Sequence, residues 1–323
     1  MGLLIVAIVM VDVFWSTLST NGAGPISDEV TSLVWRIFRM IHRRRQSHNL
    51  LKLSSVIILV VIFGMWILLL WTGWTVVFIS SADAVLVQET QEPAAIRERI
   101  YFVGMTLFTL GTGDLVAGGS GWRLMMSIAA FNGLLFTTLV ITYLLPVVSA
   151  AVDRRQLALS IWGLGESAEQ ILVNGWNDGS FQQLEDQLHA ISMLLLLHSE
   201  RHLAYPVLQY FHASDPRADL SPRIATLDDA TALLEFCVSS DARLTPSSVR
   251  SVRQALNCYF RRVEKQHIYR ADEPPPLPDF DRLRKAEIPL CDGEAMREGF
   301  RQNEDRRRLS YGLLRGDAWH WGD

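Results

Sequence analysis

The hexapeptide at residues 109–114 reads Thr-Leu-Gly-Thr-Gly-Asp, with glycine at alternate positions. A dehydrated cation needs a column of oxygen atoms that replaces its water shell and still lets it leave. Backbone carbonyls form such a column only when successive residues all turn their C=O groups inward, which requires alternating right- and left-handed backbone. Glycine at 111 and 113 makes that alternation cheap. A glycine-rich surface turn is the alternative, and the flanking segments must decide between the two.

The hexapeptide resembles the Thr-Val-Gly-Tyr-Gly-Asp signature of potassium channels. The resemblance implies that Thr109 gives its hydroxyl and carbonyl to the innermost K⁺ sites, that Leu110, Gly111 and Thr112 give their carbonyls, and that Gly113 forms the outermost ring. K⁺ ions in the filter would be the only cofactor, and no organic cofactor is expected. The resemblance also implies a homotetramer, because one chain provides one filter strand.

Two residues depart from the family pattern. Thr112 replaces the aromatic residue that normally braces the filter, and Met105 stands where many relatives carry a buried Glu. Tyr101 and Phe102 are expected to support the filter as an aromatic cuff, together with Asp114. A less braced filter leaves weakly selective cation conduction as the alternative to potassium selectivity.

Composition separates the chain into two parts. Of its 323 residues 49% are hydrophobic, and nearly all of the excess lies before residue 152. The net charge of −4 argues against a nucleic-acid partner. Cys237, Cys258 and Cys291 are odd in number and show no metal-binding spacing, so we expect reduced cytosolic thiols. The chain therefore predicts a membrane part followed by a soluble part.

Residues 1–20 predict a first transmembrane helix, slightly short for the roughly 20 residues that a bilayer asks for. No basic region precedes the apolar run and no cleavage site follows it, which argues against a signal peptide. Asp12 lies in its middle, where an acid is costly and usually faces protein or water. A hydrogen bond to a neighbouring helix or a contact with water is one interpretation, and a role in transport is the other.

Residues 21–50 predict a cytoplasmic amphipathic helix and a basic linker. Its apolar residues recur at helical spacing, and its arginines fall mostly opposite or after them. A basic amphipathic helix lies flat on an anionic membrane surface, which makes membrane lipid a partner; a packed cytosolic helix is the alternative. The arginine cluster at 36–45 also marks the cytoplasmic side, so the N-terminus is expected outside.

Residues 51–152 predict a pore domain. Residues 54–79 are long enough to span, with Trp71 and Trp74 near the outer end. Pro93 suits the first turn of a helix running to about Phe108. Only residues 100–108 of that helix are apolar, which is too short to span and fits a re-entrant half-helix whose C-terminus points at the membrane centre.

A second long apolar helix is expected at 122–152. Gly133 lies where inner helices of potassium channels resemble one another in carrying a hinge glycine, and Pro146 should kink the helix near its cytoplasmic end. Both are candidates for the gate. A packing glycine and a simple kink are the alternatives.

Residues 153–270 predict a helical cytoplasmic domain, and 271–323 a Pro-rich linker and charged tail with at most a short helix, or an arm packing on a neighbouring subunit. The stripe Phe181, Leu184, Leu188, Ile191 and Leu195 indicates a core face rather than a coiled coil. The run at 163–168 matches G-x-G-x-x-A after a possible strand at 157–162, but no alternating strands and helices follow, so a nucleotide-binding fold is disfavoured. His198 and His202 are expected to be a solvated or capping pair rather than a metal site.

Together these features predict an all-α membrane protein with three transmembrane helices, a re-entrant pore helix and filter, and an all-α cytoplasmic C-terminal domain. We expect a multi-pass protein of the plasma membrane, a bacterial inner membrane, with its C-terminus in the cytoplasm. No residues form a catalytic constellation, so no enzymatic activity is expected. A non-conducting membrane-anchored signalling or scaffold protein with a pore-like fold is the alternative from another class.

Overall fold

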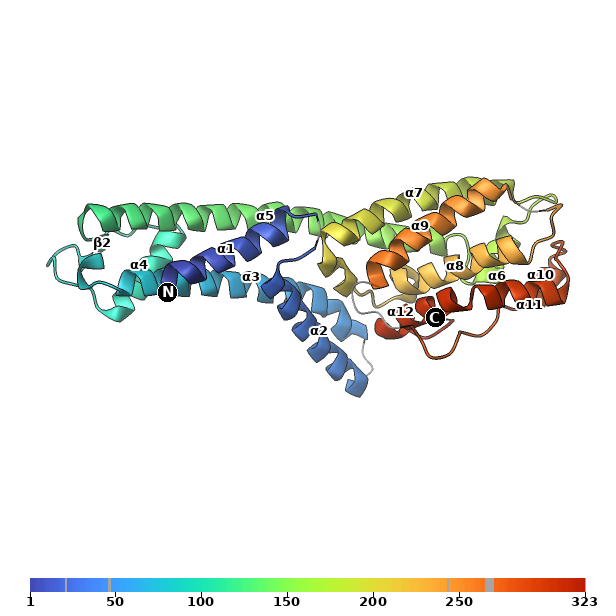
Figure 1. Ribbon diagram of the computed structural model, residues 1–323, viewed down its shortest axis with the longest axis horizontal. Coiled ribbons are helices and arrows are strands. Elements are labelled where there is room, and N and C mark those ends of the chain that lie inside the picture. Colours follow the sequence, from blue (N-terminus) through green and yellow to red (C-terminus); the bar gives the residue numbers. More distant parts are fainter. Residues whose placement is uncertain (21, 46–47, 243, 265–269, 323) are drawn as a thin grey trace. The chain divides into compact units, whose positions relative to one another are not determined.

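The computed structural model describes residues 1–20, 22–45, 48–242, 244–264 and 270–322. Its α-helices and β-strands are α1 (Gly2–Leu18), α2 (Pro25–Arg45), α3 (His48–Ile79), β1 (Val85–Val87), α4 (Ile96–Leu107), β2 (Leu115–Ala117), α5 (Gly119–Trp162), α6 (Ala168–Gly175), α7 (Gln182–Ala204), α8 (Leu220–Phe236), α9 (Pro246–Glu264), α10 (Phe280–Lys285), α11 (Gly293–Gln302) and α12 (Glu304–Gly316) (Figure 1). Short 3₁₀ turns lie at Ala82–Ala84, Pro206–Tyr210 and Pro216–Ala218. The fold is mostly helical, and the strands β1 and β2 are a small correction to the all-α expectation.

The described residues divide into two compact units. Unit 1 comprises Met1–Arg45, Leu53–Val148 and Ala204–Val207, and unit 2 comprises Gln46–Lys52, Ser149–Leu203 and Leu208–Asp323. Helix α5 contributes residues to both units.

Among the described residues, two helices are long and apolar enough to cross a membrane. They are the Leu51–Ile79 part of α3 and the whole of α5. Helix α1 is apolar but has only 17 residues, so a third span stays a prediction. Helix α5 continues through Pro146 to Trp162, well past the expected end at residue 152. The segment 157–162, considered above as a strand, is therefore the last part of this helix.

Small residues bring α1 against α3. A Cβ added to Gly2 would lie 2.5 Å from the carbonyl oxygen of Gly73, and one added to Gly73 would lie 2.8 Å from a methyl group of Val6. Glycine at both positions therefore lets the two backbones approach closely, as in packed membrane helices.

Asp12 fixes the entry of the chain into α2. Its side chain is 1% exposed. It accepts hydrogen bonds from Ile26 N at 2.9 Å, Ser27 Oγ at 2.5 Å and the indole of Trp66 at 2.8 Å. The carboxylate thus satisfies free amides in the first turn of α2, as a capping side chain does, and holds α2 to α3. Of the interpretations of Asp12 given above, the structure shows the hydrogen bond to a neighbouring helix.

Helix α8 lies at the centre of unit 2 and packs against α6, α9, α11 and α12. The core around it also takes in α7. The stripe of Phe181, which directly precedes α7, and of Leu184, Leu188, Ile191 and Leu195 within α7 is buried there, which confirms it as a core face. The run at 163–168 is a turn into α6, in which Ser167 Oγ accepts from Gln170 N at 3.2 Å. Its glycines therefore serve a tight connection.

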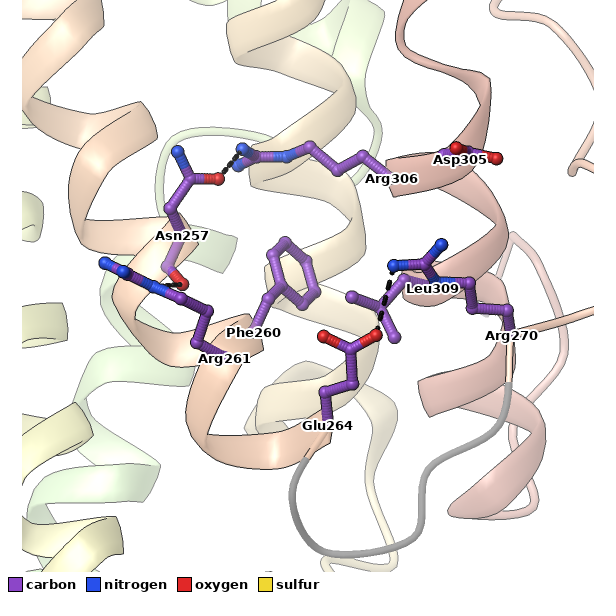
Figure 2. A pocket seen from close by; sticks show the side chains of 8 residues that line it. All are labelled: Asn257, Phe260, Arg261, Glu264, Arg270, Asp305, Arg306 and Leu309. Carbon is purple, nitrogen blue, oxygen red and sulfur yellow. Dashed lines mark hydrogen bonds and ion pairs between the residues drawn. The ribbon is translucent and has the colours of Figure 1, made fainter.

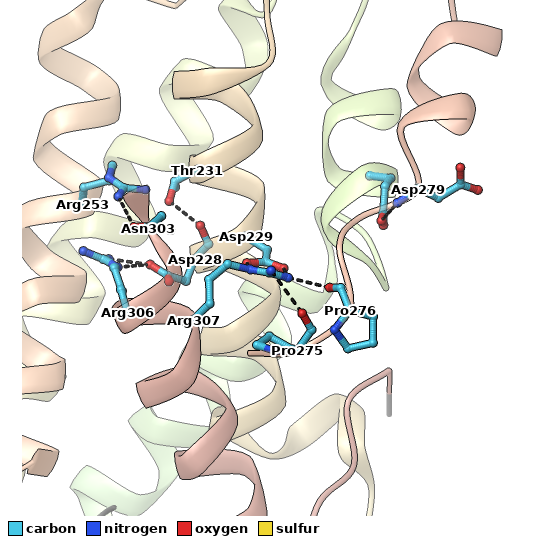
Figure 3. Close-up of polar contacts among 11 residues, drawn as sticks. Asp228, Asp229, Thr231, Arg253, Pro275, Pro276, Asp279, Asn303, Arg306 and Arg307 are labelled. Carbon is cyan, nitrogen blue, oxygen red and sulfur yellow. Dashed lines mark hydrogen bonds and ion pairs between the residues drawn. The ribbon is translucent and has the colours of Figure 1, made fainter. Parts of the chain in front are cut away.

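The C-terminal segment forms three helices, α10 to α12, instead of a charged tail with at most one short helix. Buried charges anchor it (Figure 3). Arg307 of α12 bonds both carboxylate oxygens of Asp229 at 2.9 and 3.0 Å, and also the carbonyls of Pro275 and Pro276 at 3.2 and 2.6 Å. The neighbouring Arg306 pairs with Asp228 at 2.5 Å. Consecutive arginines on α12 thus pair with consecutive aspartates on α8.

The His198 and His202 pair is buried, so the expectation of a solvated or capping pair is wrong. The two residues are 2% and 1% exposed, and the centres of their rings lie about 6 Å from each other and from the ring of Tyr259. Burial lowers the pKa of His198 well below its usual range, and the charges of His202 and Arg154 act in the same direction. Among the described residues no three His, Cys, Asp or Glu side chains are grouped to hold a metal ion.

Candidate functional site

The half-helix expected before the hexapeptide is α4, which runs from Ile96 to Leu107. Pro93 was expected in the first turn of this helix, but the helix begins three residues later, because Pro93 pairs as a β-bridge with Leu86. Glu98 accepts a hydrogen bond from Ala95 N at 2.6 Å and so closes the first turn. A helix of 12 residues is about 18 Å long, shorter than the hydrocarbon core.

Arg99 anchors the start of α4, a role that the sequence alone did not indicate. It is 6% exposed and donates to the carbonyls of Ala94 at 2.8 Å, Phe78 at 3.1 Å, Ser81 at 2.6 Å and Ala82 at 2.7 Å. Among the described residues no carboxylate pairs with it. One guanidinium therefore ties the start of α4 to the end of α3 by backbone contacts alone.

Glycines let α4 pack closely between the two long helices. A Cβ on Gly104 would lie 2.6 Å from the indole of Trp71 in α3. A Cβ on Gly133 of α5 would lie 2.0 Å from the carbonyl oxygen of Leu107, at the end of α4. Gly133, a candidate for the gate, thus also accommodates the C-terminus of α4. Pro146, the other candidate, lies inside a continuous α5.

The backbone of the hexapeptide alternates in handedness. The φ angles of Thr109, Gly111 and Gly113 are 55°, 50° and 79°, and those of the residues between them are not positive. Thr109 also ends α4, because Leu110 N donates to the carbonyl of Met105 at 2.9 Å, the pattern of a left-handed helix cap. A left-handed conformation is uncommon for threonine and is found at constrained sites. Alternation of this kind is what a column of inward-facing carbonyls requires.

Thr112 takes part in a chain of hydroxyl contacts. Tyr101 Oη lies 3.3 Å from Thr112 Oγ1, which in turn donates to Asp114 Oδ1. Phe102 points elsewhere and packs edge-on against Phe78, with ring centroids 5.3 Å apart. Of the two expected cuff residues, Tyr101 thus forms a hydrogen bond to the hexapeptide, and the role of Phe102 stays a prediction.

A small sheet holds the outer end of the hexapeptide. Val85 to Val87 of β1 pair antiparallel with Leu115 to Ala117 of β2. Gln88 N adds a hydrogen bond to the carbonyl of Asp114 at 2.9 Å. The hexapeptide is therefore fixed at both ends, by the cap of α4 and by this sheet.

The strand between these anchors is exposed on a single chain. Residues 108–114 are all exposed, and Leu110 shows 66% of its surface.

Unit 2 contains a pocket of ≈ 500 Å³ between α9, α12 and Arg270 (Figure 2). Phe260 and Leu309 are its buried apolar residues. Its polar side chains bind one another: Arg270 pairs with Glu264 at 3.1 Å, and Arg306 donates to Asn257. These contacts connect neighbouring segments at the surface of unit 2. They involve none of the residues predicted for the ion pathway.

Residues 55–150 match the protein family described as "Ion channel". The match takes in most of α3, all of α4 and the hexapeptide, and most of α5. This match indicates that the protein is an ion channel of the membrane, and membership of an ion channel family argues against an enzyme.

The whole chain is 30% identical over 321 residues to YdjJ of Bacillus subtilis (strain 168), an uncharacterized membrane protein. The similarity covers 99% of this chain and 94% of the relative. The chain belongs to the same family as that protein, and the similarity includes unit 2 as well as the channel domain. No solved structure matches the chain.

Proposed function

We propose that this protein is a tetrameric cation channel that conducts K⁺ passively through the carbonyls of Thr109, Leu110, Gly111, Thr112 and Gly113. The alternation of positive φ at Thr109, Gly111 and Gly113 carries the proposal, because it allows successive carbonyls to share one side of the strand. The exposed strand of one chain supplies a quarter of the oxygen cage, and three further copies supply the rest.

The gate is proposed on α5, at Gly133 and Pro146. Gly133 faces Leu107 at the end of α4, so a movement of α5 at this point would displace a residue two positions before the filter strand. Pro146 lacks the amide that would bond to the carbonyl of residue 142, which weakens the helix one to two turns from unit 2.

In the proposed topology the N-terminus lies outside, α1 is a third span, and unit 2 lies in the cytoplasm of a prokaryotic cell. Membrane lipid is the partner proposed for α2. Leu33, Ile37 and Met40 are 53%, 48% and 62% exposed on this helix, and Arg36 and Arg39 are on the same helix. Exposed apolar residues beside arginines suit an anionic bilayer surface.

Replacing Gly111 by Ala tests the filter. The added Cβ has open space around it, but φ of 50° is unfavourable for alanine. We expect K⁺ flux into liposomes to be lost while assembly is kept. Gly64→Ala is the matched control, because Gly64 lies inside α3 with open space around it and without a positive φ. Flux that survives Gly111→Ala would remove this strand from the ion pathway, and a protein without any flux would favour the non-conducting scaffold.

A second candidate is a weakly selective cation channel. The observation that favours it is the hydroxyl chain from Tyr101 through Thr112 to Asp114, which stands where the family has an aromatic brace. Selectivity and conduction are separate properties, and the reversal potential distinguishes them.

A further inference from the structure

Helix α7 has apolar residues on two opposite faces. One face is the buried stripe that ends at Leu195. At about 100° per residue, Met193 and Leu197 lie about 140° and 180° around the helix from buried Leu188. They are 60% and 48% exposed, and Ala190 beside them is also exposed. A helix that is apolar on opposite sides is normally covered on both.

The spacing of the exposed face suits another helix. Ala190, Met193 and Leu197 follow one another at steps of three and four residues, the repeat by which paired helices interlock. Leu196, 40% exposed, widens the apolar surface on one side. A small residue at 190 and a large one at 197 would fit together if they met across the interface.

The charges at the two ends of this face are complementary to each other. Asp186 is exposed near the start of α7, and Arg201 is partly exposed near its end, where it pairs with Asp153 of α5. An antiparallel pair of α7 helices centred between Met193 and Leu194 places Asp186 opposite Arg201. A parallel pair would place each Asp186 against its own copy, and such like-charge contacts are unfavourable.

We propose that α7 pairs antiparallel with α7 of a second copy of this chain through Ala190, Met193 and Leu197. In this pairing Ala190 of one copy lies opposite Leu197 of the other, and the two Met193 side chains are neighbours. The proposal rests on the proposed function only in that several copies assemble: two such pairs would link the chains of a tetramer two by two, and the pore domains would join the two pairs.

Cysteine cross-linking of the full chain in membranes tests the pairing. Met193→Cys should give an oxidised dimer of twice the chain mass on a denaturing gel, beyond the level seen with the native cysteines of the unmodified chain. The double variant Ala190→Cys/Leu197→Cys should also cross-link. Ala190→Cys alone should not, because its two copies are offset by about 10 Å along the antiparallel helices, and a disulfide needs Cα atoms within about 7 Å.

Leu277→Cys is the control, because Leu277 is 51% exposed in unit 2 but lies outside α7. A Met193→Cys dimer no stronger than that of Leu277→Cys would overturn the proposal. Cross-linking of Ala190→Cys alone as strong as that of Met193→Cys would overturn it too, because that result requires parallel helices. Flux from the same preparations separates the two proposals: a conducting protein without the cross-link contradicts only the pairing, and a cross-linked protein without flux contradicts only the channel.

Discussion

Arg99 of unit 1 and Arg307 of unit 2 are both buried, yet they are held in different ways. Arg99 donates to four backbone carbonyls. Arg307 divides its bonds between the carboxylate of Asp229 and the carbonyls of Pro275 and Pro276, and it also lies 5.0 Å over the ring of Phe300. Backbone carbonyls alone thus compensate the charge of Arg99, whereas the charge of Arg307 is also compensated by the buried carboxylate of Asp229.

The difference bears on what each unit can tolerate. Removing Arg99 leaves neutral carbonyls, and two of the four belong to residues that are not buried, Ser81 and Ala82, where water can replace the lost donors. Removing Arg307 leaves the carboxylate of Asp229 buried without its counter-ion. Unit 2 should therefore respond to mutation and to pH at this pair, while unit 1 should respond to mutation alone at Arg99.

Arg307→Met should have the largest effect on stability. We expect a loss of about 3–5 kcal/mol in the free energy of unfolding near pH 7, because a lone buried carboxylate remains. Thermal or urea unfolding of the full chain in detergent measures it. Arg308→Met is the control from the same arginine triplet: Arg308 pairs with Glu304 at a partly exposed site, where such pairs contribute about 0–1 kcal/mol. Equal losses in the two variants would contradict the importance of the buried pair.

The loss in Arg307→Met should shrink in acid. Burial raises the pKa of Asp229 to about 6, above its ordinary 3.8, even beside Arg307. The folded chain therefore holds this proton more tightly than the unfolded chain does, and this group adds stability as pH falls from about 6 toward 3.8. Without Arg307 the pKa rises further, so the gain begins at higher pH and is larger. A mutational loss that stays constant from pH 7 to pH 4.5 would contradict this account.

Arg99→Met should have the next largest effect, about 2 kcal/mol, because charged donors are removed but no buried charge remains. The loss should be the same at pH 7 and pH 4.5. Flux should fall as well, since Arg99 ties the start of α4 to the end of α3. Arg97→Met, two residues away and exposed, is the matched control and should change neither property. A loss for Arg99→Met that tracks pH would point to a carboxylate partner and would break the contrast with Arg307.

Thr112→Val should have the smallest effect on stability, about 1 kcal/mol or less, because it removes one hydroxyl from an exposed chain of contacts. Its effect on selectivity should be larger: we expect the permeability ratio of K⁺ to Na⁺ to fall. Tyr101→Phe keeps the Thr112 to Asp114 contact and should lower the ratio less. An unchanged ratio in both variants would show that these hydroxyls do not support the filter.

The sequence predicted the parts of unit 1 whose chemistry is local. Alternate glycines indicate alternate left-handed residues, and apolar length indicates a span, so the hexapeptide and the two long helices could be placed from residue types alone. Arg99 could not, because its acceptors are backbone carbonyls that any residue provides. The partners of Asp12 were hidden for a similar reason: the capping amides belong to Ile26 and Ser27, and only the fold brings Trp66 beside them.

In unit 2, too, only features that depend on a single stretch of chain could be predicted from the sequence. The buried stripe of α7 was recognisable because one helix face is read from one stretch of chain. The C-terminal helices were not, because their charged composition suggested a tail. Arg306 and Arg307 are paired with Asp228 and Asp229, and a match between distant charged residues has no local signal. For the same reason His198 and His202 were expected in solvent, although aromatic and helical neighbours enclose them.

The reversal potential of the purified chain in liposomes, under opposing gradients of K⁺ and Na⁺, tests the central claim most directly. The carbonyls of residues 109–113 are proposed to replace the water shell of K⁺, so the account predicts a reversal potential close to the K⁺ equilibrium potential. A value near zero would contradict potassium selectivity and would establish the weakly selective channel in its place.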